Sequence, residues 1–363
     1  MCKIVNTTTA NFKNNFEITE HFIKQLNYSS NLVLDGKYVP VKEEIETHLL
    51  SDTKKKGKVP KSKKRQKVMR GKVLIWGADY SSHDIPNYEF DDSENSFAFN
   101  RYFLKLKSID YPLKSITVDD KREIVGAVKR NFPNCIIQLC TRHYLKKISR
   151  LLGIGMIKRR IYSKQKAIDN LFASKHSEYI PTTRFSKIKL AAQLTNEISE
   201  LEYKYELLID FQNIVESIVY ASTYEIAEYR FKSLIEYFWP RRFKMREQFD
   251  KCQVDTVKKL VSDFKEHKKY LLNYLKYPHL NIPRTNNLIE GYNSQLELRL
   301  NSIKGFETIK TAENYLNVWI VKRRFSKFTD CRNNFKSLNG KTPLECAGAD
   351  ISDIRDWVEF SQN

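Results

Sequence analysis

The sequence predicts an α/β fold that is interrupted by a large all-helical insertion. Between residues 31 and 144, short apolar stretches typical of strands alternate with amphipathic helical patterns, as in a layered α/β core. From residue 145 to residue 277 the strand signal disappears, and apolar residues recur at intervals of three and four. Helical patterns resume after the segment 278–283, which a proline at each end marks as a break.

The composition indicates a folded protein with a polyanionic partner. Hydrophobic residues make up 41% of the chain and aromatic residues 12%, which excludes general disorder, and the formal net charge is +20. Nucleic acid is the first partner to expect, and an anionic membrane surface is the second. The chain contains no run of about 18 apolar residues, so we expect no membrane span. The six cysteines are too scattered for a disulfide framework, so we expect a reducing compartment: cytoplasmic and nucleoid-associated in a bacterium, nuclear in a eukaryote.

The first elements follow from local patterns. Apolar residues at roughly helical spacing over 16–26 predict one helix, and the β-rich stretch Asn31–Val41 predicts the first strand. Residues 42–72 break the strand pattern. The part from Lys54 to Lys72 contains eleven basic residues and no acid, which predicts a solvated loop, a mobile hairpin tip or a DNA-contacting arm.

Four further strands and two helices complete the predicted first part of the core. The strands are expected at 73–80, 84–90, 113–118 and 135–139, and the helices at 94–107 and 121–131. Two more helices are expected after the insertion, at 286–300 and 311–325. The predicted organisation is a short N-terminal segment 1–30, a first core part 31–144 with a basic loop 42–72, a helical insertion 145–280, a second core part 281–348 and a tail 349–363.

Three acidic residues lie in settings suited to metal chemistry. Asp35 lies in the first predicted strand, Asp119 directly follows the apolar stretch 115–118, and Glu290 lies on a predicted helix. Two carboxylates on strands and one on a helix can converge on a pair of hard cations, the arrangement needed to cut and join phosphodiesters. The intervals of 84 and 171 residues leave room for the intervening strands and for the helical insertion.

Each acid also has a simpler interpretation. The Asp-Gly dipeptide at 35–36 is common in hairpin turns, and Asp79, which closes the next apolar strand, is a competing first aspartate. Asp120 is adjacent to Asp119, and either residue is able to cap the helix that follows. Glu290 on an amphipathic helix would ordinarily face solvent.

Four short motifs accompany these acids in a fixed order. They are Val-Leu-Asp-Gly-Lys-Tyr at 33–38; Ile-Thr-Val-Asp at 116–119 with Phe-Pro thirteen residues on and Cys-x-x-His at 140–143; Arg-Thr-Asn-Asn-Leu-Ile-Glu-Gly-Tyr-Asn at 284–293; and a closing segment from Gly305 to Gly348 that contains Trp319. Together they resemble the Mutator-type (MULE-like) family of DDE insertion-sequence transposases.

The resemblance implies a retroviral-integrase-like, RNase H-like catalytic core and a DNA transposase that cleaves and joins transposon ends. It implies that Asp35, Asp119 and Glu290 hold two Mg²⁺ ions, with Mn²⁺ as a substitute. The implied partners are double-stranded DNA, both terminal inverted repeats and target, and a second copy of the chain in the active complex; no membrane partner is expected. The alternatives are a transposase-derived DNA-binding protein without catalysis and an RNase H-like nuclease.

Polar and basic residues near the glutamate are candidates for DNA contacts. Those flanking Glu290 can bind phosphate oxygens or bases, although an asparagine at 286 or 287 is equally suited to capping the helix. A second group forms a basic run on the last helix. The candidates are Arg284, Asn286, Asn287, Asn293, Lys322, Arg323 and Arg324.

Three further residues belong to the motifs without an assigned role. Cys140 and His143 are spaced like half of a tetrahedral zinc site, but no second pair of matching spacing follows, so a structural role beside the acids is the preferred interpretation. Trp319 is more often a core residue than a stacking platform. For these three residues the sequence predicts a position in the fold but no chemical role.

Overall fold

The computed structural model describes residues 12–47, 64–173, 183–248 and 251–362. The chain divides into two compact units. The sheet unit comprises residues 1–138 and 279–363, and the helical unit comprises residues 139–278. Among the described helices, none is both long and apolar enough to cross a membrane.

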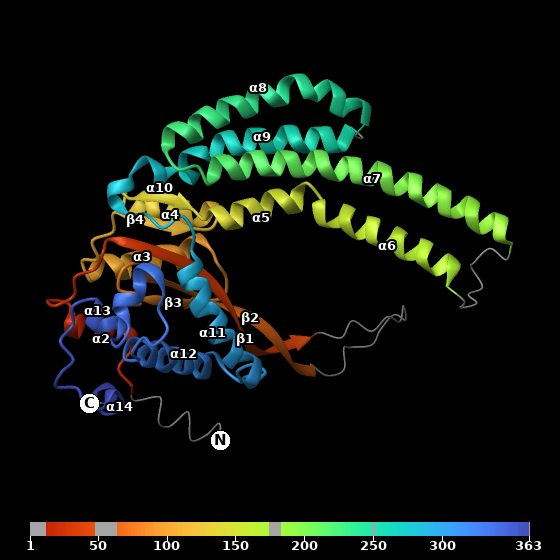
Figure 1. Cartoon of the computed structure of the whole chain (residues 1–363). Coiled ribbons are helices and arrows are strands. Elements are labelled where there is room, and N and C mark those ends of the chain that lie inside the picture. The colour runs from red at the N-terminus through yellow and green to blue at the C-terminus, as the bar shows by residue number, and fades with distance from the viewer. Residues whose placement is uncertain (1–11, 48–63, 174–182, 249–250, 363) are drawn as a thin grey trace, which may run out of the picture. The chain divides into compact units, whose positions relative to one another are not determined.

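A five-stranded sheet forms the centre of the sheet unit (Figure 1). Its strands lie in the order β3-β2-β1-β4-β5. The first three strands are antiparallel neighbours, whereas β4 runs parallel to β1. Their bounds are β1 Asn31–Thr47, β2 Lys64–Asp79, β3 Tyr88–Asp91, β4 Ser115–Val118 and β5 Ile136–Leu139.

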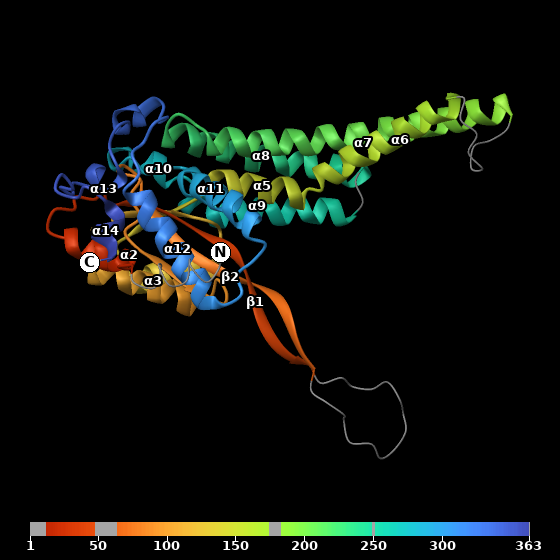
Figure 2. The ribbon, with the colours of Figure 1, turned by 90° about the horizontal axis from the view of Figure 1, so that it is seen from below.

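The first two strands are longer than the sequence predicted. The expected break at 42–72 is wrong at both ends, because β1 continues to Thr47 and β2 already begins at Lys64. The two strands pair antiparallel along this whole length, and this pairing satisfies their backbone groups (Figure 2). The rest of the predicted basic loop, residues 48–63, lies outside the described residues.

Helices cover both faces of the sheet. Trp76 belongs to a core with residues of the helices α11 and α12, whereas a Cβ on the next residue, Gly77, would lie 2.5 Å from the hydroxyl of Tyr102 on α3. Side chains of successive strand residues point to opposite faces, so these helices lie on opposite sides. The helices and turns of this unit are α2 Asn15–Phe22, α3 Ser96–Ser108, α4 Arg122–Asn131, η1 Pro278–Leu280 at the boundary, α11 Asn287–Ile303, α12 Ile309–Arg324, η2 Asn333–Leu338, α13 Pro343–Cys346 and α14 Trp357–Gln362.

The main core of the sheet unit follows from helical spacing. On α11 the buried residues Ile289, Leu296 and Leu300 repeat at intervals of four and seven, and on α12 Leu316 and Ile320 are one turn apart. These stripes pack against β1 and β2, including Trp76. The helix α11 is thereby fixed against the strand that carries Asp35.

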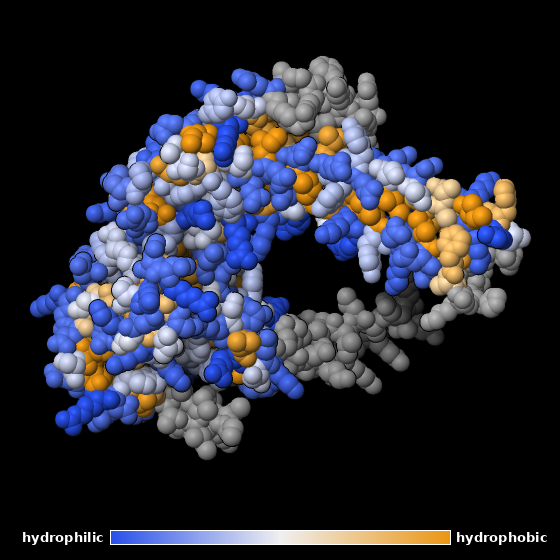
Figure 3. Space-filling view, in the orientation of Figure 1, coloured by the Kyte–Doolittle hydropathy of each residue, from blue (hydrophilic) through white to orange (hydrophobic). Residues whose placement is uncertain are grey.

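The helical unit is built from helices alone among its described residues after Leu139. Their bounds are α5 Thr141–Leu151, α6 Ile154–Phe172, α7 Arg184–Val219, α8 Tyr224–Gln248, α9 Lys251–Leu271 and α10 Asn273–Lys276. Phe264 is fully buried, and its ring lies near those of Tyr144 and Phe231. Apolar side chains also gather on the surface of α6 and α7, where Tyr162 is 70% and Phe185 78% exposed (Figure 3).

Candidate active site

Asp35 lies on β1 and is held by an asparagine of α11. The amide Nδ2 of Asn293 donates a hydrogen bond to Oδ2 of Asp35 over 2.8 Å. The indole Nε1 of Trp76 in turn donates to Oδ1 of Asn293 over 3.0 Å. Asn293 and Trp76 are both buried, so this short chain of hydrogen bonds fixes the carboxylate of Asp35 from inside the core.

Asp119 directly follows β4 and is held by a second asparagine of α11. The amide Nδ2 of Asn286 donates to Oδ1 of Asp119 over 3.0 Å. Asn286 occupies the N-cap position of α11, but its side chain makes no capping hydrogen bond. Likewise, the N-cap position of α4 is Lys121 and has no side-chain cap. The capping interpretations of Asp119 and Asn286 are therefore wrong for this structure.

One face of α11 carries Glu290 between the two asparagines that contact the aspartates. Asn286, Glu290 and Asn293 are four and three residues apart, a spacing that puts all three on the same side of a helix. Asn286 contacts Asp119, and Asn293 contacts Asp35. Glu290 lies between these two asparagines on the same helix face.

Two residues that the sequence did not single out, Glu94 and Lys121, also belong to this site. The ammonium group of Lys121 pairs with Oε2 of Glu94. Burial lowers the pKa of Lys121, but its hydrogen bond to Glu94 and the negative charges of Glu94, Asp119 and Asp35 together raise it above the ordinary lysine value. Lys121 follows Asp119 by two residues, and its partner Glu94 packs against Gly36, the neighbour of Asp35. No sequence signal identifies Glu94, which lies in a polar acidic turn.

The competing aspartate, Asp79, has a structural role. It is fully buried at the end of β2. Its oxygens accept hydrogen bonds from the hydroxyls of Ser29, Ser82 and Tyr111 at 2.8–2.9 Å. Both oxygens of Asp79 are engaged in this way, and they fix the turn that follows the strand.

A family comparison decides what kind of protein carries this site. The ISL3 family model of DDE transposases, described as transposase, matches residues 93–316, which include Asp119 and Glu290. The match spans more than half of the chain. The chain belongs to this transposase family. It is therefore a DDE-type DNA transposase, and enzymes of this family generally use divalent metal ions.

One solved structure gives a weaker comparison. The transposase is similar to the Drosophila P element transposase strand transfer complex at 12% identity, with 89% of this chain and 82% of that chain covered and a TM-score of 0.40. No curated protein matches the chain. The family assignment rests on the family model.

The site chemistry of the transposase fits a divalent metal. Asp35, Asp119 and Glu290 offer carboxylate oxygens, which are the ligands that hard cations such as Mg²⁺ prefer. The two asparagines orient the aspartates by hydrogen bonds to one oxygen each. Outer hydrogen bonds of this kind are a general feature of protein metal sites.

Three predicted DNA-binding residues, Asn286, Asn293 and Arg324, are buried, and their assignment as DNA contacts is wrong. Arg324 is fully buried and forms a bidentate ion pair with Asp84, with both N–O distances 2.7 Å. It continues the stripe of Leu316 and Ile320 at intervals of four, a signal that predicts an inward position. Asn293 likewise lies on the buried stripe of α11 and serves Asp35.

The remaining four candidates, Arg284, Asn287, Lys322 and Arg323, are exposed or partly exposed. Arg284, Asn287 and Lys322 are exposed. Arg323 is half-buried, with its guanidinium 5.1 Å from the ring centre of Tyr292 and 4.7 Å from that of Phe328. These stacking contacts hold the charge of Arg323 in a fixed place.

A groove between α11 and α12 brings several of these residues together. Its volume is about 910 Å³, and Arg299, Lys322 and Arg323 line it with the aromatic rings of Tyr315 and Trp319. None of the described residues that line it is acidic. Trp319 also packs against the core, with its ring centre 5.5 Å from that of Trp76, so it is both a core residue and part of the groove wall.

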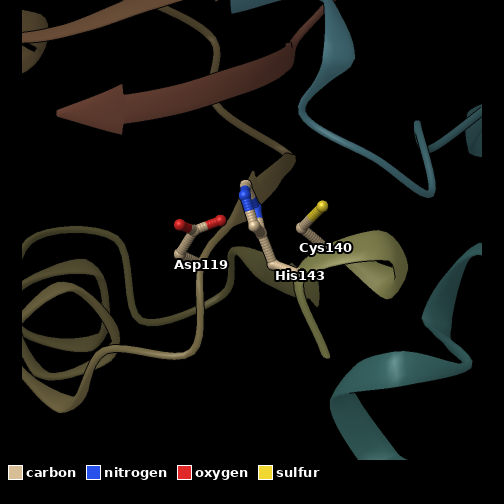
Figure 4. Close-up of side chains that lie close together, drawn as sticks. All are labelled: Asp119, Cys140 and His143. Carbon is tan, nitrogen blue, oxygen red and sulfur yellow. The ribbon is translucent and has the colours of Figure 1, made fainter. Parts of the chain in front are cut away.

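The Cys-x-x-His pair lies at the start of the helical unit. Cys140 is the buried residue before α5, and His143 lies in the first turn of that helix. Figure 4 draws both side chains together with that of Asp119. A thiolate and an imidazole are common zinc ligands, but they make only half of a tetrahedral site. The role of the pair stays a prediction.

Proposed function

We propose that Asp35, Asp119 and Glu290 are the catalytic residues of the transposase and that they hold two Mg²⁺ ions, for which Mn²⁺ can substitute. The supporting observation is the face of α11, where Asn286 contacts Asp119, Asn293 contacts Asp35, and Glu290 lies between them. When bound, such a metal pair activates a water or a 3′-hydroxyl and stabilises the leaving 3′-oxygen.

The protein's own contribution is to hold the carboxylates before DNA arrives. Asn293 is braced by the indole of Trp76, and both are buried. The amide of Asn286 is also fully buried. Because these groups are fixed by packing, each aspartate is oriented by a buried amide, and Asp35 also accepts a hydrogen bond on its other oxygen from the backbone N–H of Gly36.

The arrangement of the strands supports an RNase H-like core. Three antiparallel strands are followed by a parallel β4; Asp35 lies on β1, and Asp119 directly follows the neighbouring strand β4. The family match is to the ISL3 group. The Mutator-type assignment stays a prediction.

We further propose that the groove between α11 and α12 contacts the DNA backbone. Its three basic residues and two aromatic rings suit a phosphate-rich strand. The expected substrates are double-stranded terminal inverted repeats and target DNA, bound by a homodimer that brings two ends together. The expected location is the nucleoid-associated cytoplasm in a bacterium or the nucleus in a eukaryote.

Plasmid nicking tests the catalytic proposal. With Mg²⁺ or Mn²⁺ the purified transposase should nick and join DNA, and Asp119→Ala and Glu290→Ala should each abolish both reactions while leaving DNA affinity intact. Cutting without joining would favour the nuclease alternative. DNA binding without any cutting, indifferent to both substitutions, would favour a DNA-binding protein without catalysis.

A further inference from the structure

The carboxylate of Glu94 lies directly against the backbone of β1. A Cβ placed on Gly36 would lie 1.7 Å from Oε1 of Glu94 and 2.8 Å from its Cδ. Only glycine leaves room for this approach, since any other residue would push the carboxylate away. Gly36 is the neighbour of Asp35, so Glu94 packs against the β1 backbone next to Asp35, on the sheet face opposite to that of the Asp35 side chain.

Glu94 uses this position to hold a lysine. Its side chain is only 10% exposed, and its Oε2 pairs with the ammonium group of Lys121, whose side chain is 35% exposed. Lys121 follows Asp119 by two residues. The ion pair therefore links the turn before α3 to the turn after β4, and it keeps the lysine's head group reachable from solvent.

The lysine places a positive charge, held by Glu94, two residues after Asp119. A lysine ammonium has three N–H donors and no acceptor, so it cannot ligate a metal ion. Glu94 accepts one of these donors. The remaining donors suit an anionic oxygen, and in a site that cuts phosphodiesters the anionic oxygens are those of the DNA phosphate.

We propose that Lys121 binds the phosphate group that is cleaved or transferred, and that Glu94 is a positioning residue that holds the lysine beside Asp35 and Asp119. This inference rests on the proposed catalytic role of the three acids. Lys121 adds a positive charge from the protein to that site. Gly36 leaves the space that Glu94 needs to hold Lys121.

Substitution of the lysine is the first test. Lys121→Met should slow metal-dependent nicking about 100-fold, the usual effect of removing one group that stabilises developing charge, and Lys121→Arg should restore part of the rate. The salt dependence of binding to a random-sequence duplex should weaken by about 0.9 in slope, as expected for one lost phosphate contact. Lys114→Met is the matched control, because Lys114 is exposed at the other end of β4.

Substitution of the anchor separates positioning from metal binding. Glu94→Gln should slow nicking about 10- to 100-fold, leave Mn²⁺ affinity unchanged, and add nothing further in the Lys121→Met background. Gly36→Ala, which displaces the Glu94 carboxylate, should act in the same direction. Gly126→Ala is its control, since a Cβ there meets nothing within 4 Å.

Two results would overturn the inference. One is a Lys121→Met protein with the wild-type nicking rate and the wild-type salt slope. The other is a Glu94→Gln protein that loses Mn²⁺ affinity as Asp119→Asn does, which would make Glu94 a metal ligand. If the catalytic proposal itself failed, nicking would survive Asp119→Ala, and the salt slope, which requires no cutting, would still decide for or against the phosphate contact.

Discussion

Asn293 joins two parts of the chain that are 258 residues apart by donating a hydrogen bond to Asp35 over 2.8 Å. The same side chain accepts a hydrogen bond from Trp76, so it transmits the rigidity of the core to an acid of the proposed site. The orientation of Asp35 is therefore set by the helix that also carries Glu290.

Removal of this amide should impair catalysis more than folding. Asn293→Ala should reduce nicking about 10- to 100-fold, because residues that orient metal ligands have effects of this size. The free energy of unfolding should fall by about 1–3 kcal/mol, since the indole N–H of Trp76 loses its buried acceptor. Ser294→Ala at the adjacent exposed position is the control. Wild-type nicking by Asn293→Ala would show that Asn293 does not position Asp35 for catalysis.

Arg324 should matter for stability and not for DNA binding. It is fully buried with Asp84, so Arg324→Met leaves a buried carboxylate without its cation, and the free energy of unfolding should fall by about 3–5 kcal/mol. Lys322→Met, two residues away and exposed, should leave stability unchanged. Urea denaturation of both proteins measures the difference. Equal stability of the two variants would contradict the structural role.

His83 should make the fold sensitive to acid. Burial, followed by the positive charge of Arg323, lowers the pKa of His83 to about 4. The unfolded chain, with a histidine pKa of about 6.5, binds the proton more readily, so stability is lost as the pH falls from about 6.5 to about 4. The loss at pH 5 should be about 2 kcal/mol.

A substitution that keeps the backbone isolates this effect. His83 has a φ of 60°, which asparagine tolerates. His83→Asn should therefore lose less stability than the wild type between pH 7 and pH 5, measured by urea denaturation at both values. Identical pH profiles would show that His83 is not the group responsible.

The groove between α11 and α12 should contribute to DNA affinity through charge. Arg299→Glu or Lys322→Glu should weaken binding to random-sequence duplex and reduce the salt slope by about 1 each. Lys327→Glu is the matched control, because Lys327 is exposed and does not line the groove. Fluorescence anisotropy at several salt concentrations gives the slopes. Equal losses in all three variants would indicate a general charge effect.

Local patterns predicted most elements of the sheet unit but not the contacts among them. The strands expected at 113–118 and 135–139 correspond to β4 and β5, and the helix expected at 94–107 to α3. The hairpin of β1 and β2 extends into residues without strand-like composition, because pairing between two strands stabilises them jointly. Such pairing joins residues that are far apart in the chain, so a short stretch of sequence does not predict it.

In the candidate site, too, local sequence patterns do not predict which residues contact one another. The Lys-Arg-Arg run at 322–324 looks uniform in sequence, yet successive helix residues point about 100° apart, so one is exposed, one stacked and one buried. The buried member is on the apolar stripe and was predictable from it. Glu94 was not predictable, because its role depends on the contact between its carboxylate and Gly36, which only the folded structure brings together.

Iron-directed backbone cleavage tests the central claim most directly. When hydrogen peroxide and ascorbate are added, Fe²⁺ bound in place of Mg²⁺ reduces the peroxide to hydroxyl radicals, which cut the polypeptide near the metal. If the α11 face gathers the three carboxylates, cuts should appear together near residues 35, 119 and 290, and all three should disappear in Asp119→Asn. Cuts at only one or two of these segments, or a pattern that survives Asp119→Asn, would contradict a shared metal site.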